Sequence, residues 1–125
     1  MTISRQVFNL SGASSAFSDT GPPFTGEIVQ MRYYPSTADT GGDLAIDLMH
    51  NLADTGEAYT FFNDNDCMGV AFARVPSQPQ THADGFDTGA SLDMPVVSAG
   101  ERLRVRVTPG GSAVAGKLYV YSKDY

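Results

Sequence analysis

Alternation of charged and apolar side chains near the end of the chain is the feature that most constrains its fold. Residues 101–107 read Glu-Arg-Leu-Arg-Val-Arg-Val, so the apolar side chains share one face of a strand and the arginines share the other. Residues 117–121 alternate in the same way, and the segment 108–116 between them has the Pro and Gly chemistry of a turn. The sequence therefore predicts a β-hairpin with one face in a core and the other facing water or a partner.

The rest of the chain has the same all-β character. Gly and Pro recur at short intervals, and no segment has sustained helical periodicity. At 125 residues the chain fits a single domain. We expect one β-sandwich, jelly-roll-like, with about eight antiparallel strands. The expected strands are residues 4–9, 26–34, 43–50, 58–63, 68–75, 92–97, 101–108 and 117–122.

The core is expected to be built from apolar residues at alternate strand positions. These residues are Val29, Met31, Tyr33, Leu44, Ile46, Leu48, Leu103, Val105, Val107, Leu118 and Val120. The long polar stretch 76–89 is expected to be a functional or mobile loop.

An extended N-terminal arm is expected to precede the sandwich. Residues 11–24 are rich in Ser, Gly and Ala and end in Gly-Pro-Pro-Phe, but they carry the rings of Phe17 and Phe24, and Phe8 lies just upstream. Rings among small polar residues cannot build a core of their own, so we expect these three to contact a partner. The predicted division is a strand and arm over residues 1–25 and a sandwich over 26–125.

Composition excludes several classes of function. The net charge of −6 argues against nucleic-acid binding, which needs a basic surface. No apolar run is long enough for a membrane span or a secretory signal, so we expect synthesis and retention in the cytoplasm. The single Cys67 cannot form an intramolecular disulfide and is expected to be buried.

No residue pattern indicates an enzyme, a metal site or a cofactor. His50 and His82 are the only histidines, and they lack the neighbouring ligands of a metal site or the nucleophile of a catalytic triad. The run 63–66 (Asn-Asp-Asn-Asp) offers oxygen ligands, but it lacks the frame of an EF-hand. We interpret it as a turn, with calcium as the alternative.

Three arginines are the candidate contact residues. Arg102, Arg104 and Arg106 lie along one strand face, either as a solvated row paired with neighbouring carboxylates or as a surface for an acidic partner. Tyr119 and Tyr121 alternate on the strand predicted to be adjacent and would extend this surface. Together with the three phenylalanines of the N-terminal segment, these residues form the predicted partner-binding set.

Several segments resemble a group of small proteins from the structural gene clusters of tailed bacteriophages. The resembling pieces are residues 26–35, 40–46, 95–105 and 116–121. They carry strand and turn signatures of the forms G-x-I-x-x-x-x-Y, T-G-x-D-L, A-G-E-R-[LI]-x-V and G-x-x-Y-V-Y.

The resemblance implies a capsid cement, or decoration, protein. Such a protein sits on the outer surface of the virion head and clamps neighbouring major capsid proteins, and its expected homo-oligomer is a dimer or trimer. It implies no catalytic residue and no cofactor. Two alternatives remain open: another virion component, such as a head fibre base, tail or connector protein, and a lectin-like carbohydrate-binding module. For the lectin the candidate platform is Tyr33, Tyr34 and Tyr59.

Overall fold

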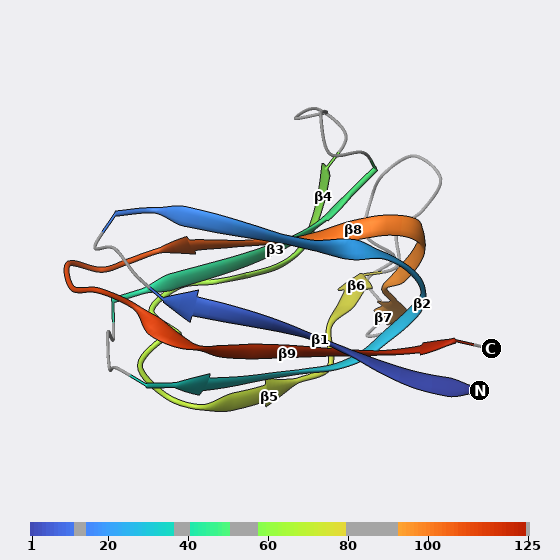
Figure 1. Ribbon diagram of the computed structural model, residues 1–125, viewed down its shortest axis with the longest axis horizontal. Helices are drawn as coiled ribbons and strands as arrows, with labels where there is room; N and C mark the ends of the chain where they lie inside the picture. Colours follow the sequence, from blue (N-terminus) through green and yellow to red (C-terminus); the bar gives the residue numbers. More distant parts are fainter. Residues whose placement is uncertain (12–14, 37–40, 51–57, 80–92, 125) are drawn as a thin grey trace.

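The chain is built from β-strands. The computed structural model describes residues 1–11, 15–36, 41–50, 58–79 and 93–124, and these residues form no helix (Figure 1). No membrane-spanning helix is therefore present among them. The strands are β1 (Thr2–Ser11), β2 (Phe17–Pro35), β3 (Asp43–Met49), β4 (Ala58–Asp64), β5 (Phe72–Arg74), β6 (Ser77–Pro79), β7 (Asp93–Pro95), β8 (Val97–Thr108) and β9 (Ala115–Asp124). The prediction of an all-β fold is confirmed for this part of the chain.

One long strand organises the sheet. Seven strands form an antiparallel sheet in the order β1-β9-β2-β8-β3-β4, with β5 paired to β2, while β6 and β7 form a separate pair. The 19 residues of β2 pair with β8 up to Glu27 and with β9 from Glu27 onward. Figure 1 shows β2 curving from the upper group of strands to the lower group.

We call the two parts of this sheet the β8 half and the β9 half. The β8 half contains residues 17–26 of β2 with β8, β3 and β4, and the β9 half contains β1, β9, β5 and residues 27–35 of β2. The hydrogen bonds run through both halves as one bent sheet, so the prediction of a sandwich of two sheets is not confirmed.

The predicted hairpin between residues 101–107 and 117–121 is wrong in its pairing. Both segments are strands, but β2 lies between β8 and β9 in the sheet. The segment between them passes from the upper to the lower group of strands at one end of the molecule (Figure 1). Strands β8 and β9 therefore bond to different parts of β2. The arginines of β8 and the tyrosines of β9, predicted to be neighbours, lie on different halves of the sheet.

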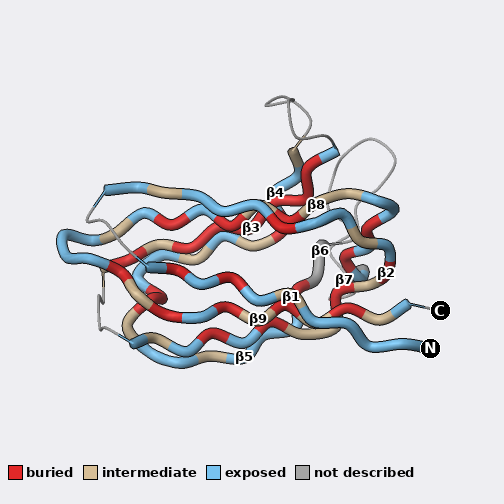
Figure 2. The backbone as a smooth tube through the Cα atoms, viewed as in Figure 1, coloured by how far each residue is buried: buried red, intermediate tan, exposed pale blue. Residues whose placement is uncertain are grey.

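The core is one cluster of buried residues that draws on strands of both halves. Figure 2 shows these buried positions alternating with exposed ones along the strands of both groups. The predicted core residues of β3, β8 and β9 are all buried, with exposed fractions of 4% or less. In β2 a register irregularity between Ile28 and Gln30 turns two nearby residues inward, so Ile28 and Met31 are both buried. Val29 is only partly buried, which makes its placement in the core wrong.

The N-terminal arm is not confirmed. Residues 17–24 belong to β2 and pair with β8, with an irregularity at the Gly-Pro-Pro segment. Phe8 is 3% exposed within the core, and Phe17 and Phe24 pack partly buried against it. Backbone pairing does not need alternating apolar side chains, so a segment that contains Gly-Pro-Pro can still pair with β8, with an irregularity at the prolines.

Part of the predicted loop 76–89 forms a short strand pair. Residues 77–79 form β6, which pairs with β7. The remainder of that loop from residue 80, including His82, lies outside the described residues.

Gly26 sits where β2 changes partner, and it provides a test of this bend. Its φ angle is +142°, and an added Cβ would lie 2.4 Å from the carbonyl oxygen of Lys123 on β9. We expect Gly26→Ala to lower the free energy of unfolding by about 2–3 kcal/mol, because a backbone clash adds to the strain. Gly100→Ala is the matched control: φ there is +84° but no atom lies within 4 Å, so only about 1 kcal/mol should be lost. Urea unfolding of the two variants measures the difference, and equal losses would contradict this role of Gly26.

Candidate interaction surfaces

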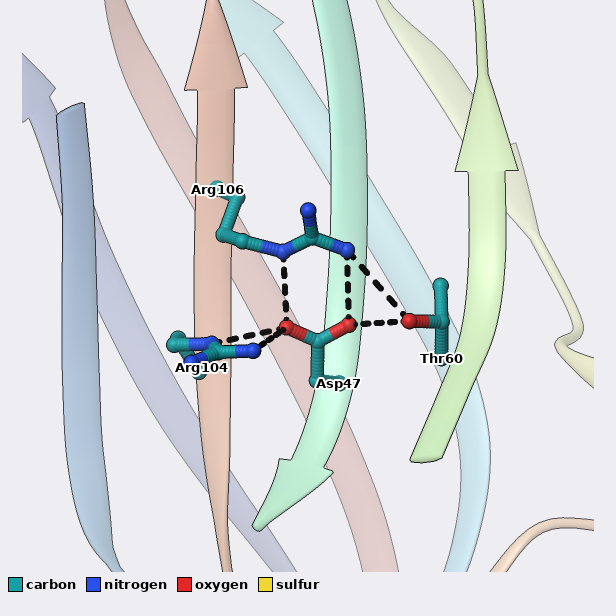
Figure 3. A network of polar contacts seen from close by, with 4 residues as sticks. All are labelled: Asp47, Thr60, Arg104 and Arg106. Atoms are coloured by element: carbon teal, nitrogen blue, oxygen red, sulfur yellow. Dashed lines mark hydrogen bonds and ion pairs between the residues drawn. The ribbon is translucent and has the colours of Figure 1, made fainter. Parts of the chain in front are cut away.

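The arginine row of β8 lies on the outward face of the β8 half. Register places Arg104 directly opposite Asp47 on β3, and Asp47 opposite Thr60 on β4. Arg106 lies opposite Ala45, whose small side chain leaves room for the guanidinium to lean toward Asp47. Four side chains from three adjacent strands are thereby brought together (Figure 3).

Asp47 is the centre of this group. Arg106 donates from Nε to Asp47 Oδ2 at 2.8 Å and from Nη2 to Oδ1 at 2.9 Å, a bidentate pair. Arg104 also reaches Oδ2, with Nε and Nη2 each at 2.8 Å. Thr60 donates its hydroxyl to Oδ1 (Figure 3). We call this group, together with Arg102, the Arg–Asp face.

The Asp47 side chain is 0% exposed, although it points away from the core. Burial by itself raises the pKa of this carboxyl, but the hydrogen bonds from Arg106, Thr60 and Arg104 outweigh it and hold the pKa below its ordinary value of 3.8. The hydrogen bond to Asp47 in turn raises the pKa of Arg106. The carboxylate is therefore ionised at neutral pH, and its one negative charge is shared between Arg104 and Arg106.

A second polar surface covers the outward side of the β9 half. Arg5 of β1 stacks on the ring of Tyr119, with its guanidinium carbon 5.3 Å from the ring centroid, and Arg32 of β2 lies 4.9 Å from the centroid of Tyr121. Tyr34 meets Tyr119 edge to face at 5.8 Å. These five residues, which we call the Tyr–Arg face, come from strands that are neighbours in the order β1-β9-β2.

The Tyr–Arg face is basic on an acidic protein. With Lys117 and Lys123 on the same face of β9, it contains four of the chain's 8 Lys and Arg residues. Among the described acidic residues, Glu27 lies beside it and pairs with Lys123. Ile3 and Val7 add apolar surface on β1, with 53% and 42% exposure. Tyr, Arg and exposed aliphatic side chains are the composition of a protein–protein contact.

A hollow adjoins this face where β1 ends and β9 begins. Its volume is about 410 Å³, within the range of small-ligand sites. Tyr34 and Tyr119 line it together with Asn9, Ser36 and Lys117.

The predicted contact residues are divided among three places. Arg102, Arg104 and Arg106 share one outward face as expected, whereas the tyrosines of β9 lie on the other half of the sheet. The three phenylalanines contribute to the core. The outward face of β1 carries Ile3, Arg5 and Val7, and two apolar residues of three gave no signal that this face points outward. No sequence signal paired Arg5 with Tyr119 either.

The remaining candidates for chemistry lie apart. Burial raises the pKa of the Cys67 thiol to about 11, and the nearby charge of Asp64 adds to the shift. In the run 63–66, Asp66 donates its backbone N–H to Asp43, and Asp64 pairs with Arg74 at 3.3 Å. Among the described residues no group of three or more His, Cys, Asp and Glu side chains is placed to hold a metal ion.

Comparison with known proteins found no matching family model, no matching curated protein and no matching solved structure.

Replacing the buried carboxylate tests the Asp47 network. Asp47→Asn keeps the shape but leaves two arginines without their counter-charge, and we expect a loss of about 2–3 kcal/mol in the free energy of unfolding at pH 7. Asp64→Asn, which breaks an exposed ion pair, should cost less than about 0.5 kcal/mol. Because the folded pKa of Asp47 is lowered, its stabilisation is present above pH 3.8 and is lost as the pH falls through the folded pKa. Denaturant unfolding of wild type and Asp47→Asn from pH 7 to pH 2 should therefore show their free energies of unfolding converging in acid. A difference between them that stays constant over this range would contradict the network.

The thiol of Cys67 should be unreactive in the folded protein. With a pKa of about 11 and a buried sulfur it is almost entirely protonated at pH 7. We expect reaction with a disulfide reagent to be slow in buffer and at least about 100-fold faster in denaturant. The absorbance of the thiolate that the reagent releases measures both rates. Rapid reaction in buffer would show that the thiol is accessible in the folded protein.

Proposed function

We propose that this protein is a non-catalytic structural subunit that decorates the outer surface of a tailed-bacteriophage head and clamps neighbouring major capsid proteins. It is made in the host cytoplasm and becomes part of the virion. In this proposal it binds no nucleic acid, membrane or cofactor, and it acts as a homo-oligomer, either a dimer or a trimer. The two halves of its bent sheet serve as the two layers of a jelly-roll-like sandwich.

The Tyr–Arg face is the observation that carries the proposal. Its arginines are held over tyrosine rings, so less side-chain entropy is lost when a partner covers them. Its positive charge suits an acidic protein surface and steers the approach of one. The resemblance to decoration proteins supports the same reading, because its segments include residues 26–35 of β2 and 116–121 of β9, which supply Arg32, Tyr34 and both tyrosines of β9.

The mechanism is the addition of many modest contacts. A specific interface buries roughly 1,600 Å² in total, which a sheet face with its flanking loops can supply. Many copies on one particle would together oppose the outward pressure of packaged DNA. No bond has to be made or broken, and the exposed side chains of the Tyr–Arg face are those that a binding role uses.

Particles prepared without this chain provide the test. Purified wild-type protein should bind them and raise the temperature at which they release DNA, whereas the folded double variant Arg5→Glu, Arg32→Glu should bind at least about tenfold more weakly. Arg74→Gln removes a basic side chain on β5 that is 54% exposed and should bind like wild type. Gel densitometry of sedimented particles measures occupancy. Failure of the wild type to bind would reject the decoration role, and unimpaired binding by the double variant would reject this face.

A carbohydrate-binding module is the second candidate, favoured by the hollow beside Tyr34 and Tyr119. The platform suggested by the sequence is wrong in part, because Tyr33 is 0% exposed and donates its hydroxyl to the carbonyl of Met68. Tyr59 lies on β4, in the other half of the sheet. A glycan array comparing wild type with Tyr34→Ala distinguishes this function, since only a lectin would lose a glycan signal. Another virion component, such as a fibre base, tail or connector protein, would use the same face on a different partner.

A further inference from the structure

A surplus of positive charge marks the Arg–Asp face as more than a structural ion pair. Arg104 and Arg106 both bind Asp47, and Arg102 lies farther along the same face of β8, opposite Met49. Asp43 also lies on this face of β3, so three arginines share it with two described carboxylates. Asp47 already accepts from both of its bound arginines and from Thr60 (Figure 3). Its acceptor capacity is therefore taken up by these contacts.

Donors remain on this face. The side chain of Arg102 makes no hydrogen bond or ion pair with another described residue. Arg104 and Arg106 use Nε and Nη2 toward Asp47, which leaves Nη1 of each without an acceptor among the described residues. The Arg106 side chain is 44% exposed and that of Arg104 23% exposed, so a ligand can reach them.

Asp47 also fixes the orientation of two guanidinium groups. A bidentate pair with a buried carboxylate holds the plane of Arg106, and two contacts hold Arg104. Flexible arginines lose rotamer freedom on binding, whereas these two are ordered beforehand. On β2, Thr20 pairs with Arg104 and Ser18 with Arg106, and both of these side chains are small. Pro23 pairs with Arg102.

The spacing of the row indicates what it binds. Alternate residues of a strand lie about 6.8 Å apart. Both edges of β8 are paired, so a ligand would lie over the outward face of the sheet, where an extended segment parallel to β8 presents its own alternate side chains at the same interval. Guanidinium groups recognise carboxylates bidentately. A carboxylate at every second position of an extended segment would therefore meet Arg102, Arg104 and Arg106 in turn.

We propose that the Arg–Asp face is a second docking surface, which binds an extended acidic polypeptide segment carrying carboxylates at alternate positions. The charge of the ligand complements the arginines of this face, and carboxylates at alternate positions match their spacing. Inward side chains of both sheet halves share one core cluster, so this face points away from the Tyr–Arg face. The subunit would thus hold acidic partners on opposite sides. This goes beyond the proposed function, which needs only the Tyr–Arg face.

The test uses the full chain and a ten-residue synthetic peptide that alternates glutamate and serine. In ¹⁵N–¹H spectra at low salt, the peptide should shift backbone signals of β8 and β3 and the Nε–H signals of Arg104 and Arg106. A peptide of the same composition with its glutamates in one block should bind at least threefold more weakly. Arg102→Glu should weaken the response of these signals at least fivefold, and it should leave folding intact because no described partner is lost.

Arg5→Glu is the matched control, since it changes the net charge equally but lies on the Tyr–Arg face. It should leave the shifts of β8 and β3 within twofold of wild type. Shifts confined to β1 and β9, or equal weakening by both variants, would overturn the proposal. So would a twelve-residue oligothymidylate that perturbs β8 more strongly than the peptide does, because the ligand would then be a nucleic acid. None of these outcomes depends on virus particles, so the decoration role is tested separately.

Discussion

The bend of β2 is the constraint on which the rest of the structure depends. One strand bonds to β8 along its first part and to β9 along its second, and Gly26 at the change of partner has a φ of +142° that few other residues would accept. Because both halves include part of β2, the bend of this strand brings their inward side chains into one core cluster. The two outward surfaces follow from this arrangement, since each half keeps one face free.

Net charge conceals how the charges of this protein are arranged. The chain is acidic overall, at −6, but basic side chains gather on the described outward face of each sheet half. On the β9 half, basic side chains lie among tyrosine rings, and on the β8 half they crowd around Asp47. Strand faces gather residues from distant parts of the sequence, so an average over the chain cannot report them. Exclusion of partners from net charge alone therefore holds for the molecule as a whole and not for each of its surfaces.

The two faces differ in how their arginines are ordered. Arg5 and Arg32 rest on aromatic rings and remain exposed, an arrangement that contributes about 0.5–1 kcal/mol at such sites. Arg104 and Arg106 are held by a buried carboxylate, whose loss would leave like charges side by side. The first face offers arginines stacked on tyrosine rings, whereas the second offers guanidinium groups at a fixed spacing along one strand. This difference suits broad attachment on one side and recognition of a particular segment on the other.

Alternation by itself determined that this chain is all-β, which residues of β3, β8 and β9 enter the core, and that the arginines of β8 share one face. These properties follow from the period of two in a strand, which requires no knowledge of its neighbours. Tertiary structure alone decided that β2 separates β8 from β9, that Phe17 packs on the chain's own core, and that Asp47 pairs with Arg104 and Arg106. The reason is that strand order depends on backbone hydrogen bonds, which every residue except proline can donate, so the identity of a strand's partner leaves little trace in the sequence.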